Sequence, residues 1–82
     1  MTAKLIFYTT PGCHLCEHAA ELLREFTART DESTRFELEE VDIAADEKLV
    51  ELYGIRIPVV KNANTQREIG WPFGLEELAT LF

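Results

Sequence analysis

The chain has 82 residues, of which 15 are acidic and 8 basic, so its formal net charge at neutral pH is −7. This length is typical of one domain, and a hydrophobic fraction of 46% is ordinary for a globular protein. The negative charge disfavours nucleic acid and anionic membranes as partners, and no apolar run reaches the roughly 18 residues of a membrane span. We therefore expect a single domain over residues 1–82. Since the N-terminus does not look like a secretory signal, we also expect a cytoplasmic location.

The first half of the chain predicts a strand, a helix and a second strand. Residues 4–8 are a short apolar run rich in β-forming residues, and a Thr-Thr-Pro-Gly turn follows. Residues 13–29 contain no Gly or Pro and have the apolar face of an amphipathic helix. That face consists of Leu15, Ala19, Leu22, Leu23 and Phe26. Residues 35–41 begin by alternating apolar and acidic side chains, as a partly buried strand does.

The second half predicts a helix, a hairpin and a closing helix. The short helix covers residues 45–54, with Asp46 as its N-cap and Gly54 as a left-handed stop. The hairpin turns at residues 62–65, and its first strand contains Pro58, a residue that suits the start or edge of a strand. The order β-α-β-α-β-β-α predicts an α/β fold, a four-stranded mixed sheet with three helices on its two faces.

Cys13 and Cys16 are the only two cysteines of the chain, and three interpretations of the pair compete. A structural disulfide would close a loop of only four residues, worth about 2 kcal/mol in the chain-entropy model, so it would be a weak staple. A structural zinc site needs four ligands, but His14 and His18 lie away from Cys16 around the helix and no second Cys pair exists. We therefore expect no metal, and we favour thiol–disulfide exchange.

The helix arithmetic gives the two thiols different roles in such an exchange. Cys13 lies at the start of the helix, where free backbone N–H groups and the helix dipole favour a thiolate. Cys16 lies on the apolar side and is sheltered. Cys13 is thus the expected nucleophile and Cys16 the resolving thiol. A protonated His14 would favour the thiolate further; the alternative is a solvated surface histidine.

The segment "YTTPGCHLCEHA" resembles that of small bacterial glutaredoxin-like proteins with a Gly-Cys-His-Leu-Cys motif. With the element order above, nearly the whole chain resembles the short, glutaredoxin-type form of the thioredoxin fold. The resemblance implies a dithiol–disulfide oxidoreductase that acts on protein or small-molecule disulfides. It also implies a cis peptide bond at Pro58, with the free N–H and C=O of Ile57 binding a substrate chain as an added strand.

The chain departs from typical dithiol glutaredoxins at the positions that hold glutathione. Arg56-Ile57-Pro58 replaces their Thr-Val-Pro, Gly70-Trp71 replaces Gly-Gly, and the usual basic anchors are missing or displaced. Arg56 and Lys48 are the candidate substitutes. These departures disfavour glutathione as the cosubstrate, and no other cofactor is expected. Trp71 is interpreted as a cover over the end of the sheet; the alternative is a residue that lines the cleft beside Pro58.

These observations lead to one preferred function and one rival. The preferred function is a monomeric oxidoreductase whose partner is a disulfide-containing protein or a small thiol. The rival is a redox-inert module of the same fold, which docks a partner at the Pro58 edge.

Overall fold

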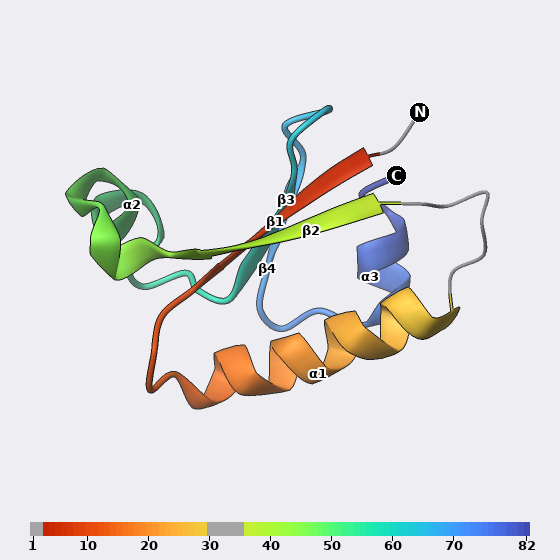
Figure 1. The fold of residues 1–82 in the computed structure, drawn as a ribbon, viewed down its shortest axis with the longest axis horizontal. Coiled ribbons are helices and arrows are strands. Elements are labelled where there is room, and N and C mark those ends of the chain that lie inside the picture. The colour runs from red at the N-terminus through yellow and green to blue at the C-terminus, as the bar shows by residue number, and fades with distance from the viewer. Residues whose placement is uncertain (1–2, 30–35) are drawn as a thin grey trace.

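The computed structural model describes residues 3–29 and 36–82, which form one layered α/β unit (Figure 1). The predicted order of strands and helices is confirmed, with one additional 3₁₀ turn, η2, before the second helix. The elements are β1 (Ala3–Thr9), α1 (His14–Arg29), β2 (Phe36–Asp42), η2 (Ile43–Ala45), α2 (Glu47–Tyr53), β3 (Val59–Asn62), β4 (Glu68–Gly70) and α3 (Leu75–Ala79).

The four strands form one mixed sheet in the order β2-β1-β3-β4. β1 pairs with β2 in parallel and with β3 antiparallel, and β3 pairs with β4 antiparallel. In the parallel pair Phe7 lies opposite Glu40, and Thr9 lies opposite Asp42. The mixed topology is the one expected from a β-α-β crossover followed by a hairpin.

Helices cover both faces of the sheet. Alternate residues of a strand point to opposite faces, so the apolar run of β1 presents side chains to both faces that must be buried. On one face, Leu5, Phe7 and Val60 belong to a buried cluster with residues of α1 and α3. On the other face, Tyr8 and Val59 pack with Ile43 and with Tyr53 of α2. The central position of β1 follows from its sequence, since an apolar run can be buried on both sides.

Three details of the structure differ from the sequence-based expectations. Leu15 was expected on the apolar face but is 49% exposed, whereas the neighbouring Cys16 is buried as expected. Gly54 is right-handed, with φ −51°, so it is no left-handed stop; a Cβ atom there would lie 2.5 Å from the Val50 carbonyl oxygen, so close approach accounts for the glycine. The expected first residue of the second strand, at position 35, lies outside the described residues.

One other local expectation, the N-cap of the second helix, is confirmed. The Asp46 side chain accepts a hydrogen bond from the Lys48 N–H and so caps α2. Within the described residues, no helix is long and apolar enough to cross a membrane.

Candidate functional site

A tight turn connects β1 to α1 and places Cys13 just before the helix. Gly12 in this turn has φ +81°, a left-handed conformation that side chains disfavour. A Cβ atom at Gly12 would meet nothing within 4 Å, so the glycine is required by backbone conformation and not by space.

Cys13 occupies the N-cap position of α1. The Cys16 N–H donates to the Cys13 Sγ at 3.2 Å, and the Cys13 carbonyl accepts from the Glu17 N–H at 3.2 Å. The sulfur thus has the place that a Ser, Thr or Asp oxygen has in an ordinary cap. Both cysteines are free thiols in this structure.

Cys16 lies one turn deeper and is only 3% exposed. Burial raises the pKa of the Cys16 thiol; hydrogen bonding to Cys13 adds to this effect, and hydrogen bonds with the Thr9 side chain and Thr10 backbone oppose it. Cys13 is half-buried. The expected difference between an accessible first thiol and a sheltered second thiol is therefore present in the structure.

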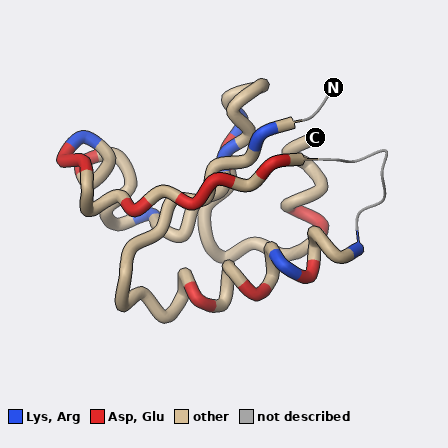
Figure 2. The backbone as a smooth tube through the Cα atoms, viewed as in Figure 1, with Lys and Arg blue, Asp and Glu red and all other residues tan. Residues whose placement is uncertain are grey.

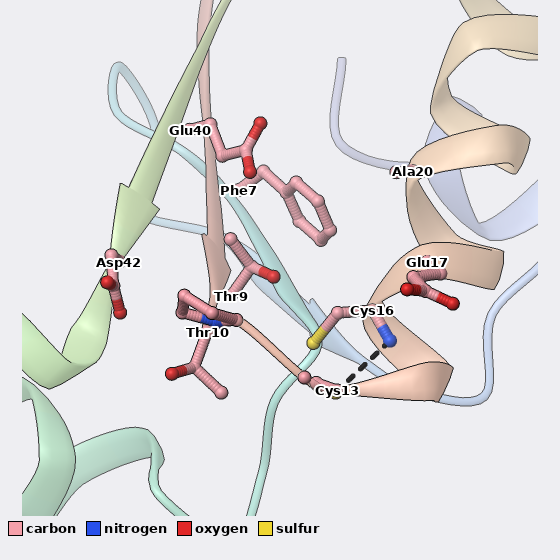
Figure 3. A pocket seen from close by; sticks show the side chains of 11 residues that line it. Phe7, Thr9, Thr10, Cys13, Cys16, Glu17, Ala20, Glu40 and Asp42 are labelled. Carbon is pink, nitrogen blue, oxygen red and sulfur yellow. Dashed lines mark hydrogen bonds between the residues drawn. The ribbon is translucent and has the colours of Figure 1, made fainter.

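A cavity of about 270 Å³ lies beside the two thiols, between the first turns of α1 and the ends of β1 and β2 (Figure 3). Phe7, Thr9 and Ala20 form part of its lining, together with the turn that carries Gly12. Three carboxylates also line it: Glu17, Glu40 and Asp42. Sequence analysis assigned these acids no role in the site. The signal that could have identified two of them is their position on β2, where residues 36, 38, 40 and 42 share one face.

His14 points to solvent and not into this cavity. Its side chain is 92% exposed, and its Nδ1 lies 3.7 Å from the Glu17 Oε2. This geometry fits the solvated surface histidine, the alternative to a residue that tunes the thiolate. Within residues 3–29 and 36–82, no group of three or more His, Cys, Asp or Glu side chains is placed to hold a metal.

Pro58 is fully buried, and its peptide bond with Ile57 is cis. Ile57 packs against the cluster that contains Cys16, but neither residue lines the cavity. The expectation of a free N–H at Ile57 is wrong: this N–H donates to the Tyr53 carbonyl at 3.0 Å, in the turn that ends α2. Only the Ile57 carbonyl remains for pairing with a substrate chain.

Arg56, a candidate anchor for glutathione, is engaged in a side-chain network. Its Nη2 lies 2.6 Å from the Glu68 Oε1, and its guanidinium lies over the Tyr53 ring, 5.3 Å from the centroid. The Tyr53 hydroxyl donates to the Glu68 Oε2 at 2.9 Å. The sequence-based expectations did not include this network, which pairs the guanidinium with a carboxylate of the protein itself.

The network alters two ionisation equilibria. Burial, the largest effect on Glu68, raises the pKa of its carboxyl, but hydrogen bonds from Arg56 and Tyr53 outweigh it, so the pKa is lowered overall. Burial, followed by the hydrogen bond to Glu68, raises the pKa of Tyr53 to about 12. The ionised carboxylate is therefore the form that the folded protein stabilises.

The other two expectations concern Lys48 and Trp71. Lys48 is exposed near the start of α2, and it does not line the cavity. Trp71 is half-buried and meets Phe73 edge to face, with ring centroids 5.2 Å apart. It also packs against the main core cluster, which is the role expected of a cover over the sheet.

Two solved structures resemble this chain in both sequence and fold. One is the target protein XcR50 from X. campestris, 33% identical, with a TM-score of 0.74 and coverage of 93% of this chain and 91% of that one. The other is protein Ne2328 from Nitrosomonas europaea, 31% identical, with a TM-score of 0.79 and coverage of 98% and 91%.

A more distant structure has the same fold. It is the reduced form of desulfothioredoxin from Desulfovibrio vulgaris Hildenborough, 19% identical, with a TM-score of 0.70 and coverage of 99% of this chain and 79% of that one. No curated protein matches the chain. The family model described as "Glutaredoxin-like domain (DUF836)" matches residues 4–82. With its thioredoxin-like fold and its two cysteines three positions apart at the start of α1, the chain belongs to this glutaredoxin-like family.

Proposed function

We propose that this protein is a dithiol–disulfide oxidoreductase that uses Cys13 as the nucleophile and Cys16 as the resolving thiol. The observation that carries the proposal is the hydrogen bond of 3.2 Å from the Cys16 N–H to the Cys13 Sγ. A backbone donor at a helix start is suited to a negatively charged sulfur. The sheltered position of Cys16 gives it the second role.

The reaction has two exchange steps. The Cys13 thiolate attacks one sulfur of a substrate disulfide, forms a mixed disulfide and expels the other sulfur as a thiolate, which takes up a proton. Cys16 then loses its proton and attacks the Cys13 sulfur, which releases the second substrate thiol and leaves a Cys13–Cys16 disulfide. Two electrons pass to the substrate, so the next cycle needs an external thiol or dithiol as reductant.

The partner is a disulfide-containing protein or a small thiol. For an extended substrate chain, we place docking at Ile57 and Pro58 through the Ile57 carbonyl, because the N–H is occupied. Glutathione is a poor candidate for the cosubstrate, since the Arg56 guanidinium is paired with Glu68. The protein is proposed to act in the cytoplasm, as a monomer.

Reduction of insulin disulfides with dithiothreitol as the reductant tests the proposal. The wild type should accelerate reduction, and Cys13→Ser should abolish the acceleration. Pre-reduced Cys16→Ser, mixed with insulin after dithiothreitol has been removed, should accumulate a mixed disulfide visible by mass spectrometry. Ala28→Ser, an exposed change late in α1, is the matched control and should behave as wild type. An inactive wild type with insulin and with small disulfides would instead favour the redox-inert docking module.

A further inference from the structure

Carboxylates flank the cavity beside the dithiol on two sides, with Glu17 of α1 on one side and Glu40 and Asp42 of β2 on the other (Figure 3); these three residues are called the acidic wall. Among the residues that the structure describes, no Lys, Arg or His side chain lines this cavity. The acidic wall therefore belongs to the same space as the two thiols. A disulfide that reaches Cys13 from this side meets negative charge.

The acidic wall results from a change of composition along one face of β2. At the start of the strand, Phe36 packs against Phe26 and Phe82, with ring centroids 5.8 and 5.5 Å apart. The same face continues through Leu38 to Glu40, opposite Phe7, and ends at Asp42, opposite Thr9. The same face of β2 therefore packs on the core at Phe36, at the start of the strand, and presents carboxylates to the cavity at Glu40 and Asp42, at its end.

Of the three carboxylates of the acidic wall, Glu17 has His14 beside it, with the His14 Nδ1 3.7 Å from its Oε2, and the two carboxylates of β2 lack a basic partner among the described residues. Lys4 pairs with Glu39, which lies on the other face of β2, at 3.1 Å. Within the described residues Glu40 makes no ion pair, whereas Asp42 accepts a hydrogen bond from the Ala44 N–H and so caps η2. Figure 2 shows the same imbalance over a larger area, with acidic positions in red along β2 and α1.

Charge so close to a reacting sulfur acts on the approach and binding of a charged substrate. Complementary charge along a cleft raises association rates by about 10- to 1,000-fold, and like charge lowers them. The effect is largest at low ionic strength, because salt screens exposed charges over about 10 Å at 0.1 M.

We propose that the acidic wall makes the enzyme selective for disulfides that carry a cationic amine close to the sulfur, such as those of aminothiols or of lysine-flanked cysteines. Disulfides that carry carboxylates, glutathione disulfide among them, are disfavoured by the same charge. This inference rests on the proposed oxidoreductase activity and assigns its substrate class. As in the exchange described above, two electrons pass from the Cys13–Cys16 dithiol to the substrate disulfide. The reduced protein is therefore the reductant in a single turnover.

The test uses three small disulfides that differ in charge: cystamine, hydroxyethyl disulfide and dithiodipropionate. The reduced protein reacts with each in a single turnover at low ionic strength, and loss of protein thiols gives the second-order rate constant. Each constant is divided by that of dithiothreitol with the same disulfide, because leaving-group pKa alone changes exchange rates. We expect the normalised rate for cystamine to exceed that for dithiodipropionate about tenfold or more, and 0.5 M salt to reduce the ratio.

Two variants locate the effect. The double variant Glu40→Gln with Asp42→Asn should lower the cystamine-to-dithiodipropionate ratio several-fold, with Glu17 accounting for the rest, while Asn retains the oxygen that caps η2. Glu37→Gln removes one charge from the opposite face of the same strand, and it should leave the ratio at its wild-type value. A lysine-flanked peptide disulfide reduced more slowly than cystamine would limit the substrate class to small aminothiols, and faster reduction would extend it to basic protein segments.

The outcomes separate the two proposals. Equal normalised rates for the three disulfides, or a ratio that is the same in the double variant as in the wild type, would overturn the charge selectivity and leave the oxidoreductase intact. A protein that fails to reduce even the neutral hydroxyethyl disulfide would overturn the proposed function, and the selectivity with it.

Discussion

Replacement of Tyr53 by Phe isolates one hydrogen bond of the network that holds Arg56. The ring of Tyr53 stacks on that of Tyr8, with centroids 4.3 Å apart and an interplanar angle of 18°, and phenylalanine retains this packing. Only the hydroxyl is lost, and with it the 2.9 Å hydrogen bond to the Glu68 Oε2. The variant therefore measures what this hydrogen bond contributes to stability.

The expected loss follows from the surroundings of the carboxylate. Hydrogen bonds to charged groups contribute roughly 1.5–3 kcal/mol. The Glu68 side chain is 26% exposed and keeps its contact with Arg56, so water can partly replace the lost donor. We therefore expect Tyr53→Phe to lower the free energy of unfolding by about 1.5 kcal/mol. Since each kcal/mol shifts the Tm of a domain this size by roughly 4–8 °C, the Tm should fall by roughly 6–12 °C.

Urea unfolding at pH 7, followed by far-UV circular dichroism, measures this loss in a double-mutant cycle. Without its acceptor, in a Glu68→Ala background, Tyr53→Phe should cost less than about 0.5 kcal/mol. In a Glu37→Ala background, which removes an exposed carboxylate of β2, it should cost as much as in the wild type. The reasoning would be refuted if the cost were the same with and without Glu68.

Three further predictions concern the thiols and the acid limit of stability. Iodoacetamide should modify Cys13 well before Cys16 in the native protein, because Cys16 is buried and its pKa is raised; mass spectrometry of digested samples would show the reverse order if the roles were exchanged. Cys13→Ala should lower the free energy of unfolding by about 0.5–1.5 kcal/mol through loss of the α1 cap, whereas Cys13→Ser, which keeps an acceptor, should cost clearly less; equal losses in urea unfolding would contradict the capping role. Folding lowers the pKa of Glu68, so this carboxylate stabilises the protein above its ordinary pKa of 4.5, and the contribution is lost as the pH falls below that value. Glu68→Gln should therefore flatten the decline of stability between pH 6 and pH 3, and an unchanged slope would count against the network.

The sequence by itself determined the order of the elements and the position of the two thiols. The order of the elements and the position of the thiols depend on residues that are close in sequence. These are the apolar run of β1, the amphipathic pattern of α1 and the glycine that turns the chain before Cys13. The asymmetry of the thiols follows from the same helical period, which places Cys13 at the helix start and Cys16 on the buried side. The error at Leu15 is one of angle: the buried stripe of α1 runs through Cys16, Ala19, Leu23 and Phe26, and Leu15 lies about 100° around the helix from Cys16.

Only the tertiary structure decided what surrounds the thiols. Glu40 and Asp42 reach the cavity because the parallel register sets them opposite Phe7 and Thr9, and no local pattern fixes the register of strands so far apart in sequence. Arg56 is paired with Glu68 because the β3–β4 pairing brings Glu68 within reach of both Arg56 and Tyr53. The Ile57 N–H is occupied because the chain turns at the end of α2 and meets the Tyr53 carbonyl. The position of the two thiols is a local property of the sequence, but the side chains that lie beside them depend on how the fold brings distant segments together.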